Sequence, residues 1–168
     1  MAKTRLSNAS YVERGYGQVE PNHLSAKRTG EIYAQLPCAA DIEVLEQGQF
    51  AKYDYAHNEV NFDGAGEWML VYNEVKIYDE RETEEDFALI KGNYASGEMV
   101  PRLFKTHEGD IFTTNCINAT DAIKVTDVLY VGEDGILTTE ENGTMKWEVA
   151  KVYTLADGQK AVKLVRIA

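Results

Sequence analysis

Short apolar segments separated by tight-turn residues recur along most of this chain, and this feature constrains the fold most. Asp-Gly pairs stand at positions 63–64, 134–135 and 157–158, each between two apolar segments. Asp-Gly in that setting is a strong local signal for a β-hairpin, because both residues accept the positive φ that a tight turn needs. Residues 31–168 therefore predict roughly ten to twelve short strands joined by tight turns.

Two parts of the chain give the clearest strand predictions. Residues 147–153 and 161–167 flank the turn at 157–158 and predict a hairpin near the C-terminal end. Residues 68–78 form the longest apolar stretch, in which apolar side chains recur at odd-numbered positions. A period of two places those side chains on one side of the strand, so this stretch predicts a strand with one buried face.

One segment, residues 79–91, predicts a short helix. Thr83 stands where an N-cap is favoured, and the acids at 84–86 suit the positive end of a helix dipole. Phe87 and Ile90 then form one apolar edge. With so many strands and so little helix, we expect a mainly β fold, either a Greek-key sandwich or a small barrel.

The first 30 residues differ from the rest, because they show neither a helical nor a strand period. Gly15, Gly17 and Pro21 interrupt them, and apolar side chains are scattered. A polar segment with apolar anchors is typical of a strap that becomes ordered on another surface. We therefore divide the chain into an extended N-terminal arm, residues 1–30, and a β-rich body, residues 31–168. The expected partner-binding side chains of the arm are basic or aromatic: Arg5, Tyr11, Arg14, Tyr16, Lys27 and Arg28.

Charge is unevenly divided between these two parts. The chain has a net charge of −11, yet residues 1–30 hold five basic and two acidic side chains. The acidic body repels phosphate backbones, so we expect no nucleic-acid partner.

No apolar run approaches the roughly 18 residues of a membrane span, so we expect no membrane partner. No apolar stretch follows the first residues, so we expect synthesis in the cytoplasm, with Cys38 and Cys116 as free, buried thiols.

Motifs that carry catalysis are missing from the sequence. There is no Gly-x-Ser-x-Gly elbow, phosphate-binding glycine loop, dinucleotide fingerprint or His-Glu-x-x-His pair. The three histidines, His23, His57 and His107, are far apart, and His57-Asn58-Glu59 offers only part of a metal ligand set. We therefore expect no catalytic residues, no cofactor and no metal site.

Three segments resemble structural proteins of tailed bacteriophages: residues 11–21, residues 44–54 and the closing hairpin of residues 149–167. The resemblance lies in an extended arm, a Gly-Gln-Phe turn and a Val-Gly-x-Asp-Gly hairpin. The class that the chain resembles is the capsid decoration, or cement, proteins. This resemblance implies a virion protein, made in the host cytoplasm, that binds the outside of the capsid shell. Its implied partners are the major capsid protein and copies of the same chain, within an oligomeric assembly.

Two other functions fit the residues. A carbohydrate-binding module of a head fibre or tail would use exposed aromatic side chains such as Trp68 or Trp147. A small β-fold hydrolase would use acidic residues, of which the chain has 28. The ten tyrosines supply interface area but serve equally well in half-buried strands, so they do not choose between these functions.

Overall fold

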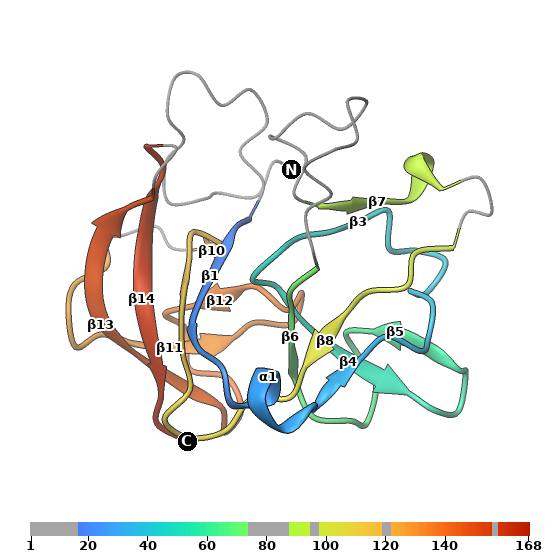
Figure 1. The fold of residues 1–168 in the computed structure, drawn as a ribbon, viewed down its shortest axis with the longest axis horizontal. Helices are drawn as coiled ribbons and strands as arrows, with labels where there is room; N and C mark the ends of the chain where they lie inside the picture. Colours follow the sequence, from blue (N-terminus) through green and yellow to red (C-terminus); the bar gives the residue numbers. More distant parts are fainter. Residues whose placement is uncertain (1–16, 74–87, 95–97, 119–121, 156–157) are drawn as a thin grey trace.

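The computed structural model describes residues 17–73, 88–94, 98–118, 122–155 and 158–168. Within these residues the protein has 14 short strands, which form three sheets, together with one α-helix and one 3-10 helix. Figure 1 shows the largest sheet on the left, where β13 and β14 are orange to red and β1 is blue, and the second sheet on the right, which includes β4 and β8. The expectation of a mainly β fold with short strands and one short helix is confirmed.

The largest sheet has seven strands in the order β1-β9-β14-β13-β11-β12-β10. Its longest pair, β13 (Lys146–Thr154) and β14 (Lys160–Arg166), is antiparallel and forms the hairpin predicted near the C-terminal end. The other strands are β1 (Val19–His23), β9 (Ile111–Thr114), β10 (Ile117–Asn118), β11 (Val128–Val131) and β12 (Leu137–Thr138). Among the described residues, the β10–β12 pair is the only parallel one in this sheet.

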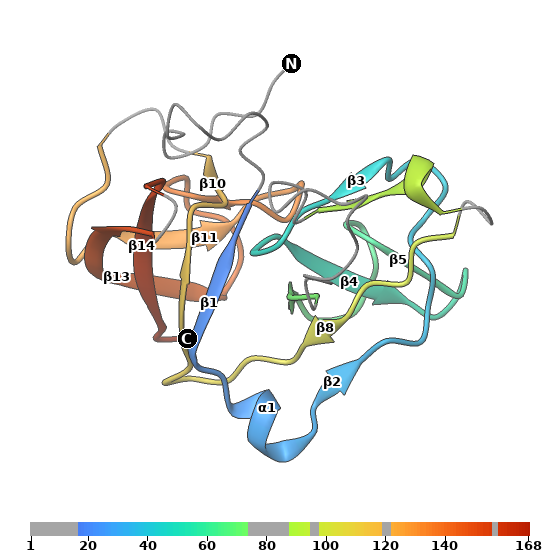
Figure 2. The same ribbon diagram turned by 45° about the horizontal axis from the view of Figure 1, so that its top comes forward.

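The second sheet has five strands in the order β2-β8-β6-β4-β5, and a separate two-stranded ribbon pairs β3 with β7. Figure 2 shows the ribbon above the second sheet, on the side of the molecule away from β13 and β14. The strands of the second sheet and of the ribbon are β2 (Ile32–Tyr33), β3 (Val44–Leu45), β4 (Phe50–Asp54), β5 (Glu59–Asn61), β6 (Met69–Val71), β7 (Leu89–Ile90) and β8 (Leu103–Phe104).

Strand β6 differs from the prediction for residues 68–78. It covers only Met69–Val71, and all three of its side chains are buried. Leu70 belongs to one core cluster, while Met69 and Val71 belong to another, so both faces of the strand are covered. The prediction of one buried face was wrong here, because β6 lies inside the sheet between β8 and β4 with packed side chains above and below. Residues 74–78 lie outside the described residues.

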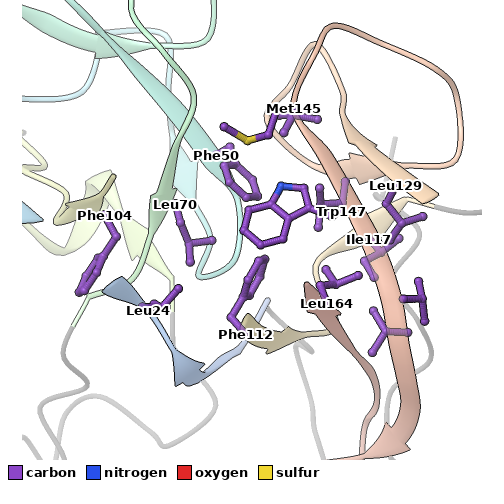
Figure 3. Packing of buried hydrophobic residues seen from close by; sticks show 14 of the residues in the cluster. Leu24, Phe50, Leu70, Phe104, Phe112, Ile117, Leu129, Met145, Trp147 and Leu164 are labelled. Atoms are coloured by element: carbon purple, nitrogen blue, oxygen red, sulfur yellow. The ribbon is translucent and has the colours of Figure 1, made fainter. Parts of the chain in front are cut away.

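The main core lies between the two large sheets. Figure 3 shows Phe50 from the second sheet beside Phe112 and Trp147 from the first. The rings of Phe112 and Trp147 meet edge to face, with centroids 4.8 Å apart and an interplanar angle of 89°. Aromatic pairs in this geometry add stability beyond the apolar area they bury. The two sheets are therefore joined by one shared core.

The helix predicted at residues 79–91 is not confirmed where the structure describes it. Residues 79–87 lie outside the described residues, and the remaining part forms β7 and the 3-10 helix η1 (Lys91–Asn93). The α-helix of the described chain is α1 (Ser25–Thr29), which ends at Gly30 with a φ of 78°. A five-residue helix has too few positions to show an apolar period, so pattern reasoning missed it.

The described part of the expected arm belongs to the body of the molecule. Strand β1 pairs antiparallel with β9, and Leu24 and Ala26 are buried in the main core. Pro21 lacks an N–H donor but is tolerated because β1 is an edge strand, and the register shifts between Glu20 and His23. The described residues of this segment, 17–30, therefore belong to the body, whereas the sequence assigned them to the arm; residues 1–16 lie outside the described residues.

Both cysteines are free thiols, as expected. Cys116 is buried, whereas Cys38 is only half-buried. Burial nevertheless raises the pKa of the Cys38 thiol to about 12, so this group stays protonated and a weak nucleophile at neutral pH.

Candidate functional site

The point where residues 1–16 join the body is held by a buried polar cluster. The backbone N–H of Gly17 donates to the Glu46 carboxylate at 2.8 Å, and that of Gln18 donates to Asn115 Oδ1 at 2.7 Å. Asn115 in turn donates from Nδ2 to Gln159 at 2.9 Å. The side chains of Glu46, Asn115 and Gln159 are all buried. Buried polar groups that are hydrogen-bonded in this way rigidify their surroundings, so the leading segment starts from a fixed point.

Glycine is required at position 17 by close packing. A Cβ atom there would lie 2.4 Å from the carbonyl oxygen of Gln47 and 3.0 Å from the Cβ of Cys116. The backbone at Gly17 can therefore pack against the residues that follow β3 and β9 only because this residue has no side chain. Gly17 was noted in the sequence as an interruption of the arm, but its partner Glu46 stands 29 residues away and carried no local signal.

The six side chains expected to bind a partner divide into two groups. Arg5, Tyr11, Arg14 and Tyr16 lie outside the described residues. Lys27 and Arg28 lie on α1, and both are exposed. The Lys27 ammonium is 5.5 Å from the ring centroid of Tyr72, within range of a cation–π interaction. These two cations therefore belong to the surface of the body.

A second polar cluster attaches α1 to the loop between β8 and β9. Asp110, which is 1% exposed, accepts hydrogen bonds from Ser25 N–H at 2.9 Å, Ser25 Oγ at 2.8 Å and His107 N–H at 3.0 Å. Ser25 Oγ also lies 2.9 Å from His107 Nδ1, and His107 Nε2 lies 3.2 Å from Glu31 Oε2. Hydroxyl, imidazole and carboxylate groups in reach of one another are the elements of a serine hydrolase site. Here, however, Asp110 competes with His107 for the single hydroxyl proton of Ser25.

Replacing Asp110 by alanine is expected to lower the free energy of unfolding by about 3 kcal/mol, because it leaves two part-buried N–H donors and the Ser25 hydroxyl without their carboxylate acceptor. Urea denaturation followed by circular dichroism measures this change. Asp127→Ala is the matched control: its carboxylate accepts one exposed hydrogen bond, from Lys124 N–H, and its loss is expected to cost below about 1 kcal/mol. Equal losses in the two variants would show that the Asp110 cluster does not stabilise α1.

The two tryptophans do not form an exposed aromatic surface. Trp147 is 0% exposed and lies in the main core, so the expectation that it could stack on a sugar was wrong. Alternation along β13 turns its indole toward the second sheet. Trp68 is half-buried and packs against the same core, and the Lys52 ammonium lies 4.2 Å from its ring centroid. The ring of Trp68 is therefore already engaged on the protein itself.

Two surface depressions are lined by residues of the described chain. A pocket of about 260 Å³ is lined by Trp68 and Lys52 together with Arg166, Met145 and Asn142. A larger, open pocket of about 610 Å³ includes four carboxylates among its lining residues: Glu133, Asp134, Glu140 and Glu141. The first combines an aromatic ring with cations, and the second is strongly acidic.

No protein-family model, curated protein or solved structure matches this chain. The two helices in the described part of the chain are also far too short to traverse a bilayer.

Proposed function

We propose that this chain is a structural virion protein that binds and stabilises the outside of a phage capsid shell, held there in part by its leading residues. The proposed role is non-enzymatic. The proposal starts from the resemblance of residues 11–21, 44–54 and 149–167 to capsid decoration proteins. Strand β1 and helix α1 pack within their own chain, so the proposed tether is confined to residues 1–16.

The observation that carries the proposal is a basic leading segment that starts from a fixed point on an acidic body. Residues 1–16 hold three basic side chains and one acidic, whereas residues 17–168 hold 14 basic and 27 acidic. A cationic segment is attracted to acidic protein surfaces, either on the major capsid protein or on a second copy of this chain. Because Gly17 is held by Glu46, the segment loses less conformational entropy on binding than a fully free tail.

Deleting residues 1–16 is expected to leave a folded body that binds shells at least tenfold more weakly. The measurement is co-sedimentation with undecorated capsid shells of the phage that encodes the chain, with thermal unfolding as the check on folding. A truncated protein that decorates shells as fully as the intact chain would contradict the proposal.

A longer deletion, of residues 1–30, separates binding from folding. It removes the hydrogen bonds of β1 to β9 and the buried side chains of Leu24 and Ala26. Loss of a buried leucine alone costs about 2–5 kcal/mol, so this variant is expected to be largely unfolded. If it instead unfolded at the temperature of the intact chain, β1 and α1 would not be part of the body.

Charge reversal tests which cations act. The double variant Arg5→Glu/Arg14→Glu changes the leading segment, and the double variant Lys27→Glu/Arg28→Glu changes α1. The first is expected to weaken shell binding more than the second, and to reduce the salt dependence of that binding more. The reverse order would place the contact on α1 and overturn the role given to residues 1–16.

The carbohydrate-binding alternative has one specific observation in its favour, the pocket beside Trp68. A sugar that stacked on this ring would have to displace the Lys52 ammonium from it or use another face. We therefore place this function second. Binding to a glycan array by the intact protein, abolished in Trp68→Ala, would reverse that order.

A further inference from the structure

The hairpin formed by β4 and β5 gathers three metal-binding side chains at its turn. Asp54 is the last residue of β4, His57 lies in the turn, and Glu59 is the first residue of β5. One ligand atom from each of the three lies within 4.8 Å of the other two. The His57 side chain is 72% exposed, so a hydrated ion can reach it from solvent. Sequence reasoning noted His57 and Glu59 but missed Asp54.

The chemistry of these three groups distinguishes them from an ordinary acidic patch. Carboxylates alone suit Ca²⁺ and Mg²⁺, whereas an imidazole suits zinc and its neighbours in the first transition row. Zinc sites that keep an open position commonly have three protein ligands of the imidazole and carboxylate types, with solvent as the fourth. One imidazole with two carboxylates therefore fits Zn²⁺ better than Ca²⁺ or Mg²⁺.

The carboxylates are already oriented by neighbouring groups. Asp54 Oδ1 accepts the N–H of Ala56 at 2.9 Å, which leaves Oδ2 facing His57 Nδ1 at 2.8 Å. Asn61 Nδ2 lies 3.2 Å from Asp54 Oδ2 and 3.3 Å from Glu59 Oε1. Asn61 is itself held, because its Oδ1 accepts the N–H of Gly64 at 2.6 Å. Groups that orient ligands in this way commonly contribute about 10- to 100-fold to metal affinity.

We propose that Asp54, His57 and Glu59 bind a Zn²⁺ ion at the β4–β5 turn, with Asn61 as a positioning residue. Tetrahedral ligands at bond lengths of about 2.0–2.2 Å lie roughly 3.3–3.6 Å apart, so His57 Nδ1 and Asp54 Oδ2, now 2.8 Å apart, must separate slightly as the ion enters. The inference is independent of shell binding, because it uses none of residues 1–16. It assigns the chain a metal-binding turn where the sequence predicted no metal.

Isothermal titration of the full chain with zinc chloride tests the proposal. We expect saturable binding of one ion per chain, at least tenfold weaker in His57→Gln and in Glu59→Gln, and weaker in Asn61→Ala. His23→Gln and Glu140→Gln are the matched controls, since they remove an imidazole and an exposed carboxylate elsewhere, and they are expected to bind as the unaltered protein does. Circular dichroism checks that each variant is folded.

A second readout places the ion on the turn itself. The ring nitrogen resonances of His57 in NMR spectra are expected to shift on addition of Zn²⁺, while those of His23 and His107 stay in place. Absence of saturable binding would overturn the proposal. Binding that is unchanged in both His57→Gln and Glu59→Gln, or shifts confined to His23 or His107, would overturn it equally.

Discussion

Gly135→Ala is expected to destabilise the protein by about 4 kcal/mol or more, because two separate costs fall on one residue. Gly135 has a φ of 74°, in the left-handed region that disfavours a Cβ atom. A Cβ built there would also lie 1.8 Å from the carbonyl oxygen of Phe50, a backbone atom that cannot rotate away. The carbonyl oxygen of Gly135 accepts the N–H of Phe50 as well, so moving the turn breaks that hydrogen bond.

Gly143→Ala separates the two costs. Gly143 has a φ of 67°, yet an added Cβ atom would meet nothing within 4 Å. Its replacement is therefore expected to cost only the conformational part, about 1 kcal/mol. Urea denaturation of both variants, followed by circular dichroism, gives the comparison. Equal losses would mean that the turn at residues 132–135 does not pack against β4 as described.

Trp147→Ala is expected to lower the free energy of unfolding by about 3–5 kcal/mol, the usual cost of removing a large buried aromatic side chain. Trp147 is fully buried, and its ring centroid lies 4.8 Å from that of Phe112 and 5.7 Å from that of Phe50. The contact with Phe50 joins the seven-stranded sheet to the five-stranded sheet, whereas Phe112 lies in the same sheet as Trp147 (Figure 3). A cavity at this position would therefore weaken the packing between sheets as well as within one.

Trp147→Phe is the matched comparison, and its loss is expected to be less than half as large. Phenylalanine keeps an aromatic ring in the core and removes the indole N–H, which has no hydrogen-bond partner in the described structure. Leaving a buried donor unpaired costs about 1–3 kcal/mol, so its removal offsets part of the lost contact area. The same denaturation measurement applies. Equal losses for alanine and phenylalanine would show that ring contacts do not hold the two sheets together.

Prediction from the sequence succeeded where the signal was local and failed where it was not. The β13–β14 hairpin was predicted from the alternation around the turn at 157–158, because period and turn residues adjoin in the chain. Strand β1 was missed, because Pro21 breaks its pattern and its partner β9 lies some 90 positions further on. Trp147 was read as exposed, since a single aromatic residue in a strand does not reveal which face is covered.

The proposed metal-binding turn shows the same division. His57 and Glu59 adjoin in the sequence and were recognised as a partial ligand set, whereas Asp54 joins them only when β4 and β5 pair. The polar cluster at Gly17 depends on Glu46, Asn115 and Gln159, whose positions span most of the chain.

The sequence by itself determined that this protein is mainly β, acidic in its body and basic in its first residues. Charge is read directly from composition, and strands and turns are indicated by the alternation of apolar side chains and by turn residues that are neighbours in the chain. Only the tertiary structure decided that residues 17–30 belong to the body, that Trp147 lies between two sheets, and that Asp54 faces His57. Those outcomes depend on contacts between residues distant in the chain, and such contacts are chosen by the packing of the whole core rather than by any local segment.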